Sequence, residues 1–244
     1  VGTEDIGAII QATGFELYDA NKLPHLGYGK SPNVVDQAGL EALAKAANGG
    51  PILRPSDGKP VQSVAFVQCA GQRDASGEHL PYCSGYCCNA SIKQAMYFKD
   101  SNPAIDTTVI YTDLRTPGNG EDFYRSAQEK GVIFTKGKVA SVTPNGNACT
   151  VNFHDLILDD RNAQIEADLV VLATGQVPNS GVNIDIPAEE QAKMEIKPVS
   201  ILNLTYRQGK DMPQLRHGFT DSHFICFPYE TRRTGIYAAG PVRR

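Results

Sequence analysis

The sequence lacks several of the signals that mark common classes of protein. Its formal net charge is -4 and its lysines and arginines are scattered, so no basic face is available for nucleic acid. No apolar run approaches the roughly 20 residues of a membrane-spanning helix, and no charged segment followed by an apolar stretch opens the chain as an export signal would. We expect no nucleic-acid partner and no direct membrane span, so any membrane association must come through partner proteins.

A glycine-rich phosphate turn is also missing. The pattern Gly-x-Gly-x-x-Gly, which cradles pyrophosphate at the start of a dinucleotide-binding domain, occurs nowhere in the chain. Alternating strands and helices are nevertheless indicated over residues 63–175, and a parallel sheet is their natural host. The sequence predicts strands at 63–68, 107–112, 132–135, 138–142, 149–153, 165–173 and 200–206, helices at 85–99, 121–130 and 188–193, and turns at 145–146 and 159–162.

A short internal repeat indicates two related domains. One apolar run ends in Ala12-Thr13-Gly14, and a second ends in Ala173-Thr174-Gly175. In flavoproteins of the glutathione reductase type, this pattern ends a strand of each nucleotide-binding domain, where glycine lets the chain turn sharply away from the sheet. A single Thr-Gly at the end of a buried strand is not specific, so the inference of two related domains depends on the pattern occurring twice.

The expected fold class is α/β, with a Rossmann-like nucleotide-binding domain and its β-meander inserted in a partial FAD-binding domain of the two-dinucleotide-fold flavoprotein type. The expected domains are a truncated first part of the FAD-binding domain at 1–62, the inserted domain at 63–178 and the return segment at 179–244. Candidate flavin contacts are Thr13, Gly14, Gly240 and Pro241. In such flavoproteins an aspartate that binds the ribityl chain usually follows the final glycine, and here Pro241 takes its place. The glycine turn of the FAD-binding domain would lie in the N-terminal half of that domain, which this sequence is expected to lack. FAD binding is therefore expected for a full-length chain.

Cysteines stand where the nucleotide-binding turn would be. Four of the six fall within twenty positions: Cys69 at the end of a predicted strand, then Cys83, Cys87 and Cys88 in the following loop and first helical turn. A helix N-terminus and Arg73 would favour thiolates there, and four soft ligands suit an iron-sulfur cluster or zinc. The spacing matches neither the common ferredoxin runs nor paired zinc knuckles, so a redox disulfide and plain buried thiols stay open.

Other single residues have ordinary interpretations. Cys149 and Cys226 each stand alone on an apolar run and are interpreted as buried structural thiols. His79 lies four residues before Cys83 and could hydrogen-bond a sulfur, although a solvated loop histidine is the more common case. Asp113 ends a strand where NAD-dependent domains bind a ribose, but without the glycine turn it is interpreted as a polar strand end.

The cysteine region resembles the HdrA family of heterodisulfide reductase subunits. The run Cys69-x-Gly-x-Arg-Asp is followed by Pro81-Tyr-Cys-Ser-x-x-Cys-Cys88 and Ile92-Lys-Gln-Ala95, and the similarity includes residues 7–33 and 165–178. In that family the matching cysteines ligate a [4Fe-4S] cluster beside the flavin. The resemblance therefore implies that Cys69, Cys83, Cys87 and Cys88 hold this cluster in an oxidoreductase subunit that is not active as an isolated segment.

Residues 227–237 resemble, more particularly, HdrA-like subunits of quinone-interacting membrane-bound oxidoreductase complexes. This resemblance implies a cytoplasmic protein that is peripheral at the inner membrane through its partner subunits. The implied partners are a quinone-reactive subunit in the membrane, together with a soluble reductase of sulfur metabolism.

Two other functions stay open at this point. One is a pyridine-nucleotide-dependent FAD disulfide oxidoreductase, in which Cys83 and Cys87 would be the redox pair because adjacent cysteines bond only through a strained ring. The other is a non-enzymatic zinc or docking module.

Overall fold

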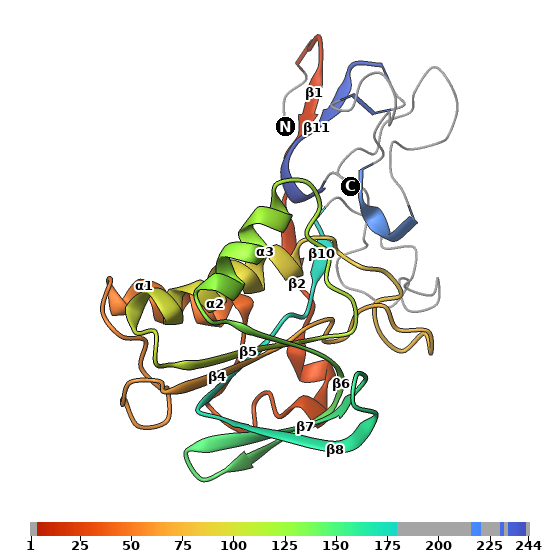
Figure 1. The fold of residues 1–244 in the computed structure, drawn as a ribbon. Coiled ribbons are helices and arrows are strands. Elements are labelled where there is room, and N and C mark those ends of the chain that lie inside the picture. Colours follow the sequence, from red (N-terminus) through yellow and green to blue (C-terminus); the bar gives the residue numbers. More distant parts are fainter. Residues whose placement is uncertain (1–3, 180–215, 221–229, 232–233, 243–244) are drawn as a thin grey trace. The chain divides into compact units, whose positions relative to one another are not determined.

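The computed structural model describes residues 4–179, 216–220, 230–231 and 234–242 of the 244-residue chain (Figure 1). The chain divides into two compact units: Leu17–Gly175, called here the sheet unit, and Val1–Glu16 with Gln176–Arg244, called the terminal unit. The sheet unit thus includes residues 17–62, which the sequence assigned to an FAD-binding domain. The functional assignment of domains 1–62, 63–178 and 179–244 stays a prediction.

A seven-stranded mixed sheet forms the centre of the sheet unit. In spatial order its strands are β3 (Val34–Asp36), β9 (Leu169–Leu172), β4 (Ser63–Val67), β5 (Asp106–Tyr111), β6 (Ile133–Asn145), β7 (Ala148–Asp155) and β8 (Asp160–Ala167). Neighbours from β3 to β6 run parallel, whereas β6, β7 and β8 form an antiparallel meander. The central strands β4 and β9 are almost wholly apolar and buried, as expected where layers cover both faces.

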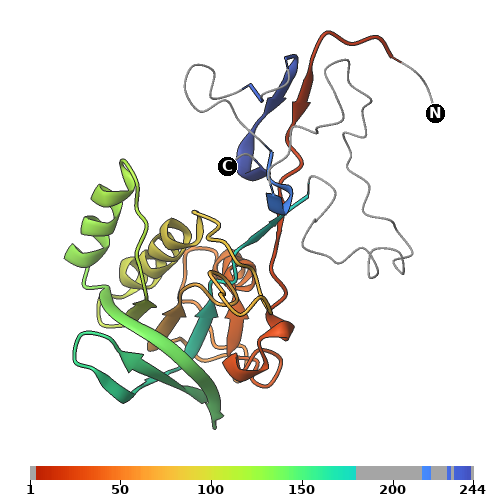
Figure 2. The same cartoon turned by 90° about the vertical axis from the view of Figure 1, so that its right-hand side faces the viewer.

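Three helices lie together on one face of the parallel strands (Figures 1 and 2): α1 (Gln37–Ala47), α2 (Cys87–Ser101) and α3 (Gly120–Glu129). The core between helices and sheet includes Ile92 and Ala95 of α2 and Phe66 of β4. Phe66 packs edge-to-face on Phe98 with a centroid separation of 6.4 Å. Strands linked by helices on one side and closed by a meander confirm the α/β, Rossmann-like class.

Most predicted elements of the sheet unit are confirmed, including the strands near 63–68 and 107–112 and the helices near 85–99 and 121–130. Gly131 ends α3 with a φ of +88°, as the sequence predicted for a C-terminal glycine.

Three details differ from the sequence prediction, the first being that the strand expected at 165–173 is divided between β8, which ends at Ala167, and β9, which begins at Leu169. The strands expected at 132–135 and 138–142 form one long strand, β6, which bends at an irregularity between Val139 and Ser141. Residues 160–162, expected in a turn, begin β8, and Asp159 with a φ of 53° makes the turn. The predicted helix at 188–193 and strand at 200–206 lie outside the described residues.

Short elements complete the described chain. The terminal unit pairs β1 (Ile9–Gln11) with β11 (Ile236–Ala238) in parallel, and β2 (Phe15–Leu17) pairs with β10 (Gln176–Pro178). Single-turn 3-10 helices are η1 (Ala20–Lys22), η2 (Pro24–Leu26), η3 (Arg216–Gly218) and η4 (Gly240–Val242). The parallel pairing places the closing strand β11 beside the first strand of the chain.

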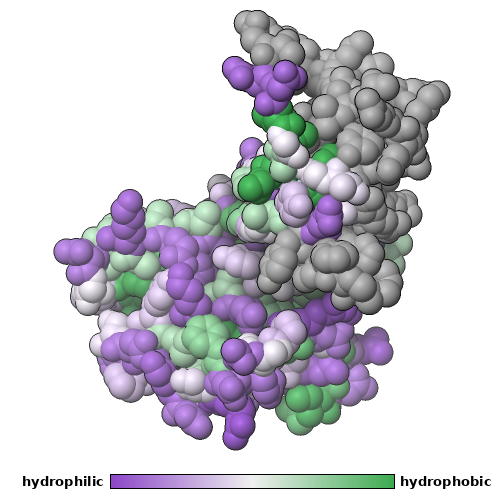
Figure 3. All heavy atoms as spheres, turned by 90° about the horizontal axis from the view of Figure 1, so that it is seen from above, coloured by the Kyte–Doolittle hydropathy of each residue, from purple (hydrophilic) through white to green (hydrophobic). Residues whose placement is uncertain are grey.

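The visible surface of the described residues is mainly hydrophilic, with hydrophobic side chains in small patches (Figure 3). In the turn between β7 and β8, Ile157 and Leu158 are exposed. Within the described part of the chain, every helix is too short or too polar to cross a bilayer.

The two Ala-Thr-Gly segments turn as the repeat predicted, because both glycines adopt left-handed backbone. Gly14 follows β1 with a φ of +71°, and Gly175 follows β9 with a φ of +87°. Their surroundings differ. A Cβ on Gly14 would meet no described atom within 4 Å, whereas a Cβ on Gly175 would lie 2.2 Å from Cδ of Gln72. Gly175 is therefore required both by its backbone conformation and by the close approach of a side chain.

Replacement of Gly175 by alanine should destabilise the sheet unit strongly. A left-handed alanine costs about 1–2 kcal/mol, and displacement of Gln72 adds to this. Gly77→Ala is the matched control, because Gly77 has a φ of +86° and open space around it. Urea unfolding should show the midpoint falling clearly more for Gly175→Ala than for Gly77→Ala. Equal shifts would contradict the close-approach argument.

Candidate functional site

The cysteine region lies at the carboxyl edge of the parallel strands, where α/β folds place their ligands. Past the end of β4, Gln68 N still donates to Ile110 O at 3.0 Å, and Ala70 N donates to Ala173 O at 3.1 Å. Between them Cys69 adopts a φ of 55°, which is uncommon for a residue with a side chain. Arg73 repeats this conformation at 55°, so the turn holds two non-glycine residues in left-handed backbone.

The other three cysteines lie at and before the start of α2. Cys87 and Cys88 are the first two residues of the helix and are buried, whereas Cys83 in the preceding loop is half-buried. The sequence prediction that this helix begins at the cysteines is confirmed.

The four thiols are close enough for their charges to interact. Burial raises the pKa of Cys87 to about 12, with smaller contributions in the same direction from the neighbouring Cys88, Cys69 and Cys83. Burial is also the first cause that raises the pKa of Cys88 and of Cys69, and Cys83 adds to both. A buried thiol with a raised pKa is a poor nucleophile, and it becomes a thiolate only when a compensating charge is present.

Two of the four sulfurs, those of Cys87 and Cys83, nevertheless receive a hydrogen-bond donor. Gln72 Nε2 lies 3.3 Å from Cys87 Sγ, and Gly85 N donates to Cys83 Sγ at 3.4 Å. The polar groups of Arg115, near Cys88, and of Arg73 and Thr112, near Cys69, oppose the effect of burial and lower the pKa of these thiols in part. Donors aimed at sulfur favour the acceptor-only thiolate, which is the form that binds metal.

These contacts bring the sulfurs into one neighbourhood without arranging them as ligands. Among the described residues, no group of three or more His, Cys, Asp or Glu side chains is positioned to hold one metal ion. The assignment of Cys69, Cys83, Cys87 and Cys88 as cluster ligands therefore stays a prediction.

Gln72 ties the region together. Besides Cys87, its Nε2 contacts Ala173 O at 3.2 Å, and its Oε1 accepts from Ser84 N at 3.1 Å and from Ser84 Oγ at 2.7 Å. One buried carboxamide thus joins the end of β9, the loop before α2 and the start of the helix. Sequence analysis missed this residue, although the small Gly175 opposite it was a signal for a close contact.

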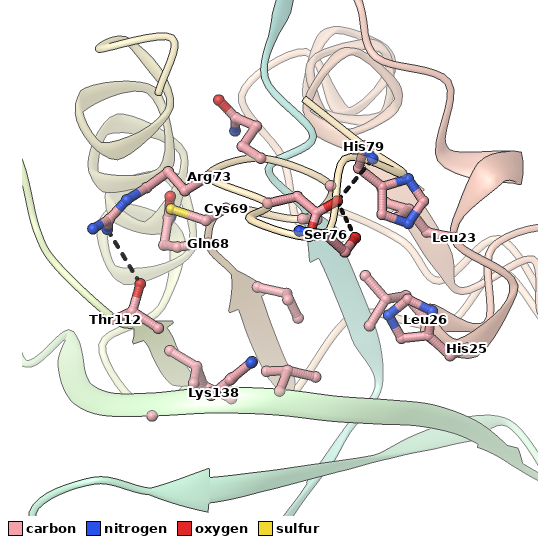
Figure 4. A pocket seen from close by; sticks show the side chains of 18 of the residues that line it. Leu23, His25, Leu26, Gln68, Cys69, Arg73, Ser76, His79, Thr112 and Lys138 are labelled. Carbon is pink, nitrogen blue, oxygen red and sulfur yellow. Dashed lines mark hydrogen bonds between the residues drawn. The ribbon is translucent and has the colours of Figure 1, made fainter. Parts of the chain in front are cut away.

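A cavity of about 570 Å³ opens beside the turn, on the side of β6 (Figure 4). Cys69 and Arg73 lie on one wall, His25 on another, and Lys138 comes from β6. His79 also lines this cavity. Its Nδ1 lies 2.9 Å from the Tyr18 hydroxyl, so it is a loop histidine with its own partner.

The structure also shows the surroundings of Asp113 and Cys149. Asp113 forms an ion pair with Arg73 at 2.6 Å, and this pairing holds the pKa of the carboxyl below its usual range. Cys149 is fully buried with its sulfur 3.6 Å from Ser31 Oγ, which confirms a structural thiol, and Cys226 lies outside the described residues.

The candidate flavin contacts lie in the terminal unit. Gln11 and Ala238 are partners in the parallel β1–β11 pair, so Thr13-Gly14 and Gly240-Pro241 follow the carboxyl ends of adjacent strands. The Thr13 hydroxyl is buried and has no partner among the described residues. A Cβ on Gly14 or Gly240 would meet no described atom within 4 Å. A buried hydroxyl without a described partner, beside two glycines with open space, is compatible with a bound cofactor. The assignment of Thr13, Gly14, Gly240 and Pro241 as flavin contacts stays a prediction.

The fold is that of flavoprotein disulfide reductases. The chain matches a solved Cu(II) complex of the HOCl-induced flavoprotein disulfide reductase RclA from Escherichia coli with a TM-score of 0.51 and 14% identity, over 96% of this chain and 40% of that one. At this identity the match shows the fold alone. No family model matches the sequence.

Sequence relatives identify the family. The HdrA subunit of ferredoxin:CoB-CoM heterodisulfide reductase from Methanosarcina mazei is 34% identical over 241 residues, which are 97% of this chain and 28% of that protein. The HdrA subunit of H(2):CoB-CoM heterodisulfide,ferredoxin reductase from Methanothermobacter thermautotrophicus is 38% identical over 243 residues, 97% of this chain and 33% of that protein. The chain belongs to the HdrA-like family, and it spans about a third of the length of these relatives.

Loss of the Gln72 bridge should loosen the cysteine region. Gln72→Met removes the donor to Ala173 O and the acceptor for Ser84, which leaves buried partners unsatisfied at a cost of about 1–3 kcal/mol. The urea midpoint should fall, and mass-mapped alkylation of Cys87 should become faster. Gln128→Met is the control, because that exposed amide bonds only Tyr124 among the described residues. Unchanged alkylation of Cys87 in Gln72→Met would contradict the bridging role.

Proposed function

We propose that the chain is the flavin- and iron-sulfur-dependent electron-transfer part of an HdrA-like oxidoreductase subunit. The observation that carries the proposal is the neighbourhood of four cysteines at the sheet edge, in which Cys87 and Cys83 each have an N–H donor at the sulfur. This edge is where a Rossmann-like domain would otherwise bind a nucleotide, and its glycine turn is absent. Membership of the HdrA-like family supports the proposal.

Cys69, Cys83, Cys87 and Cys88 would hold a [4Fe-4S] cluster. Thiolates are the usual ligands of such clusters, and the cluster supplies one-electron transfer when bound. The chain's own contribution is to bury the site and to direct N–H donors at the sulfurs, which are two of the means by which proteins set a cluster's reduction potential.

The disulfide oxidoreductase alternative has less support. A redox disulfide enzyme needs an accessible thiolate of lowered pKa, whereas burial raises the pKa of Cys87 to about 12. A pyridine nucleotide would also need the missing phosphate turn. Zinc is less suited because two of the four candidate ligands, Cys87 and Cys88, are consecutive.

The relatives' names suggest the surroundings of the protein. They are subunits of reductases that use ferredoxin or hydrogen, so we propose that this chain also works within a multi-subunit redox complex. The finer proposal is a cytoplasmic, peripheral subunit that connects a quinone-reactive membrane partner with a soluble reductase of sulfur metabolism. Its support is the resemblance of residues 227–237 to HdrA-like subunits of quinone-interacting complexes.

Iron analysis tests the cluster directly. After anaerobic reconstitution the 244-residue chain should be brown and contain about four irons per chain. Cys69→Ser, Cys83→Ser, Cys87→Ser and Cys88→Ser should each lose most of this iron, because a hydroxyl is a far poorer ligand for iron-sulfur clusters.

Cys149→Ser is the matched control for iron content. Its thiol is fully buried but lies against Ser31, so the substitution should leave the iron content unchanged. An iron-free wild-type chain, or equal iron loss in the control, would count against the proposed ligands.

Removal of the Thr13 hydroxyl should weaken FAD binding. Thr13→Val keeps the shape of a half-buried side chain whose buried hydroxyl lacks a described partner, so the fold should remain intact. A lost hydrogen bond of about 1 kcal/mol corresponds to a several-fold rise in Kd for FAD. The measurement is FAD titration of the full-length protein, with Gly7→Ala as the control because its Cβ would meet open space. Equal affinities for Thr13→Val and wild type would remove Thr13 from the flavin site.

A further inference from the structure

The cavity beside the turn after β4 has the size of a binding site. Its volume of about 570 Å³ lies within the usual range for small-molecule sites. The residues that line it come from the η2 region, the turn after β4, the end of β5 and the middle of β6, all within the sheet unit. Of the four proposed cluster ligands, Cys69 alone is among these residues.

The cavity lies on the face of the sheet that the helices do not cover. Val67 and Ile110 line it and are register partners in β4 and β5, so their side chains point to the same face. Phe66 and Val109, the residues before them, belong to the core under the helices, and side chains of a strand alternate between faces. A nucleotide bound in the usual Rossmann manner places its pyrophosphate at a helix N-terminus, so this cavity is a different site.

Apolar side chains form much of the wall. They are Leu23, Leu26, Val67, Ile110 and Val139. Figure 4 shows Leu23 and Leu26 on the same side of the cavity as His25. An apolar molecular skeleton therefore fits against this wall.

The one carboxylate of the described wall is already satisfied. It belongs to Asp74, whose Oδ1 accepts from Ser76 N at 3.0 Å, and whose Oδ2 accepts from Ser76 Oγ at 2.6 Å and from His79 N at 2.8 Å. The Ser76 hydroxyl and these backbone donors hold the pKa of Asp74 well below its usual range. Asp74 therefore stabilises its own loop, and a cationic ligand would find no other carboxylate on the described wall.

The basic groups of the wall are less engaged. Lys138 is exposed, and its ammonium has no hydrogen bond or ion pair with another described residue. The His25 ring has none either, and its pKa is lowered first by burial and then by neighbouring basic groups. Arg73, by contrast, is paired with Asp113. Figure 4 shows Lys138 on β6 and His25 on another wall, so basic groups face the cavity from two sides.

We propose that this cavity binds a small organic acid, whose carboxylate pairs with Lys138, with His25 as a further N–H donor and the apolar wall around the carbon skeleton. A charged donor forms a stronger hydrogen bond with a carboxylate than with a neutral oxygen, so the site selects an anion over a neutral molecule of the same shape. Neither Lys138 nor His25 is a proposed ligand of the cluster, and the inference therefore stands apart from the proposed function.

Three probes of nearly equal size test the selection for negative charge. Benzoate, benzamide and benzylamine are anionic, neutral and cationic at neutral pH. In a nuclear magnetic resonance titration of the isotope-labelled, iron-free 244-residue chain, benzoate should shift the ring signals of His25 and bind several-fold more tightly than benzamide. Benzylamine should leave these signals unchanged.

Lysine variants test the position of the carboxylate. Lys138→Gln should raise the Kd for benzoate about tenfold, because it removes a charge-assisted hydrogen bond, whereas Lys138→Arg should stay close to wild type. Lys136→Gln is the matched control, since Lys136 is an exposed lysine of the same strand that is not among the residues lining the cavity. Both positions are exposed, so the melting temperatures should match that of the wild type.

Protection of a thiol gives a second readout. Cys69 lines the cavity and Cys83 does not. Saturating benzoate should slow the mass-mapped alkylation of Cys69 in the iron-free chain and leave that of Cys83 unchanged.

The inference is overturned if benzoate does not bind the wild-type chain, or if benzamide binds as tightly. Equal loss of affinity in Lys138→Gln and Lys136→Gln overturns it too, as does alkylation of Cys69 at an unchanged rate under saturating benzoate. None of these results changes the iron content, which alone tests the proposed cluster, so the two proposals fail separately.

Discussion

The carboxamide of Gln72 is the contact on which the cysteine region depends. It joins the end of β9 through Ala173, the loop through Ser84 and the helix start through Cys87. This is possible only because Gly175 has no side chain in the space that the amide occupies. The glycine that makes the turn thus also leaves room for the amide that joins Cys87 to the neighbouring strand end and loop.

The second constraint is electrostatic. Burial opposes ionisation of Cys69, Cys87 and Cys88, whereas the donors around the sulfurs favour it. The balance lies on the side of the neutral thiol, since the pKa of each of these three is raised. Burial against free thiolates makes these cysteines poorly suited to act as nucleophiles on a disulfide, and the proposed iron would have to compensate their charge.

Much of the sheet unit followed from pattern because its central strands are continuous apolar runs and α2 has a clear apolar stripe. Helix α1 was missed although Asp36 caps it and Asn48 ends it in left-handed backbone, both of which are recognisable signals. The start of β8 was mistaken for a turn because Asp160 and Arg161 are polar, and a strand at the sheet edge can be exposed on both faces. The left-handed Cys69 and the unpaired Gln68 depend on tertiary packing, so no sequence pattern announces them.

The two Ala-Thr-Gly turns show how one backbone motif serves different purposes. In the terminal unit the space beside Gly14 is open among the described residues, and the neighbouring Thr13 hydroxyl is unpaired. In the sheet unit the space beside Gly175 is filled by Gln72, and cysteines occupy the turn where glycines would receive a phosphate. The proposed flavin contacts thus lie beside the turn with open space, and the proposed cluster ligands lie beside the turn whose space is filled, so the two proposed cofactors would belong to different units.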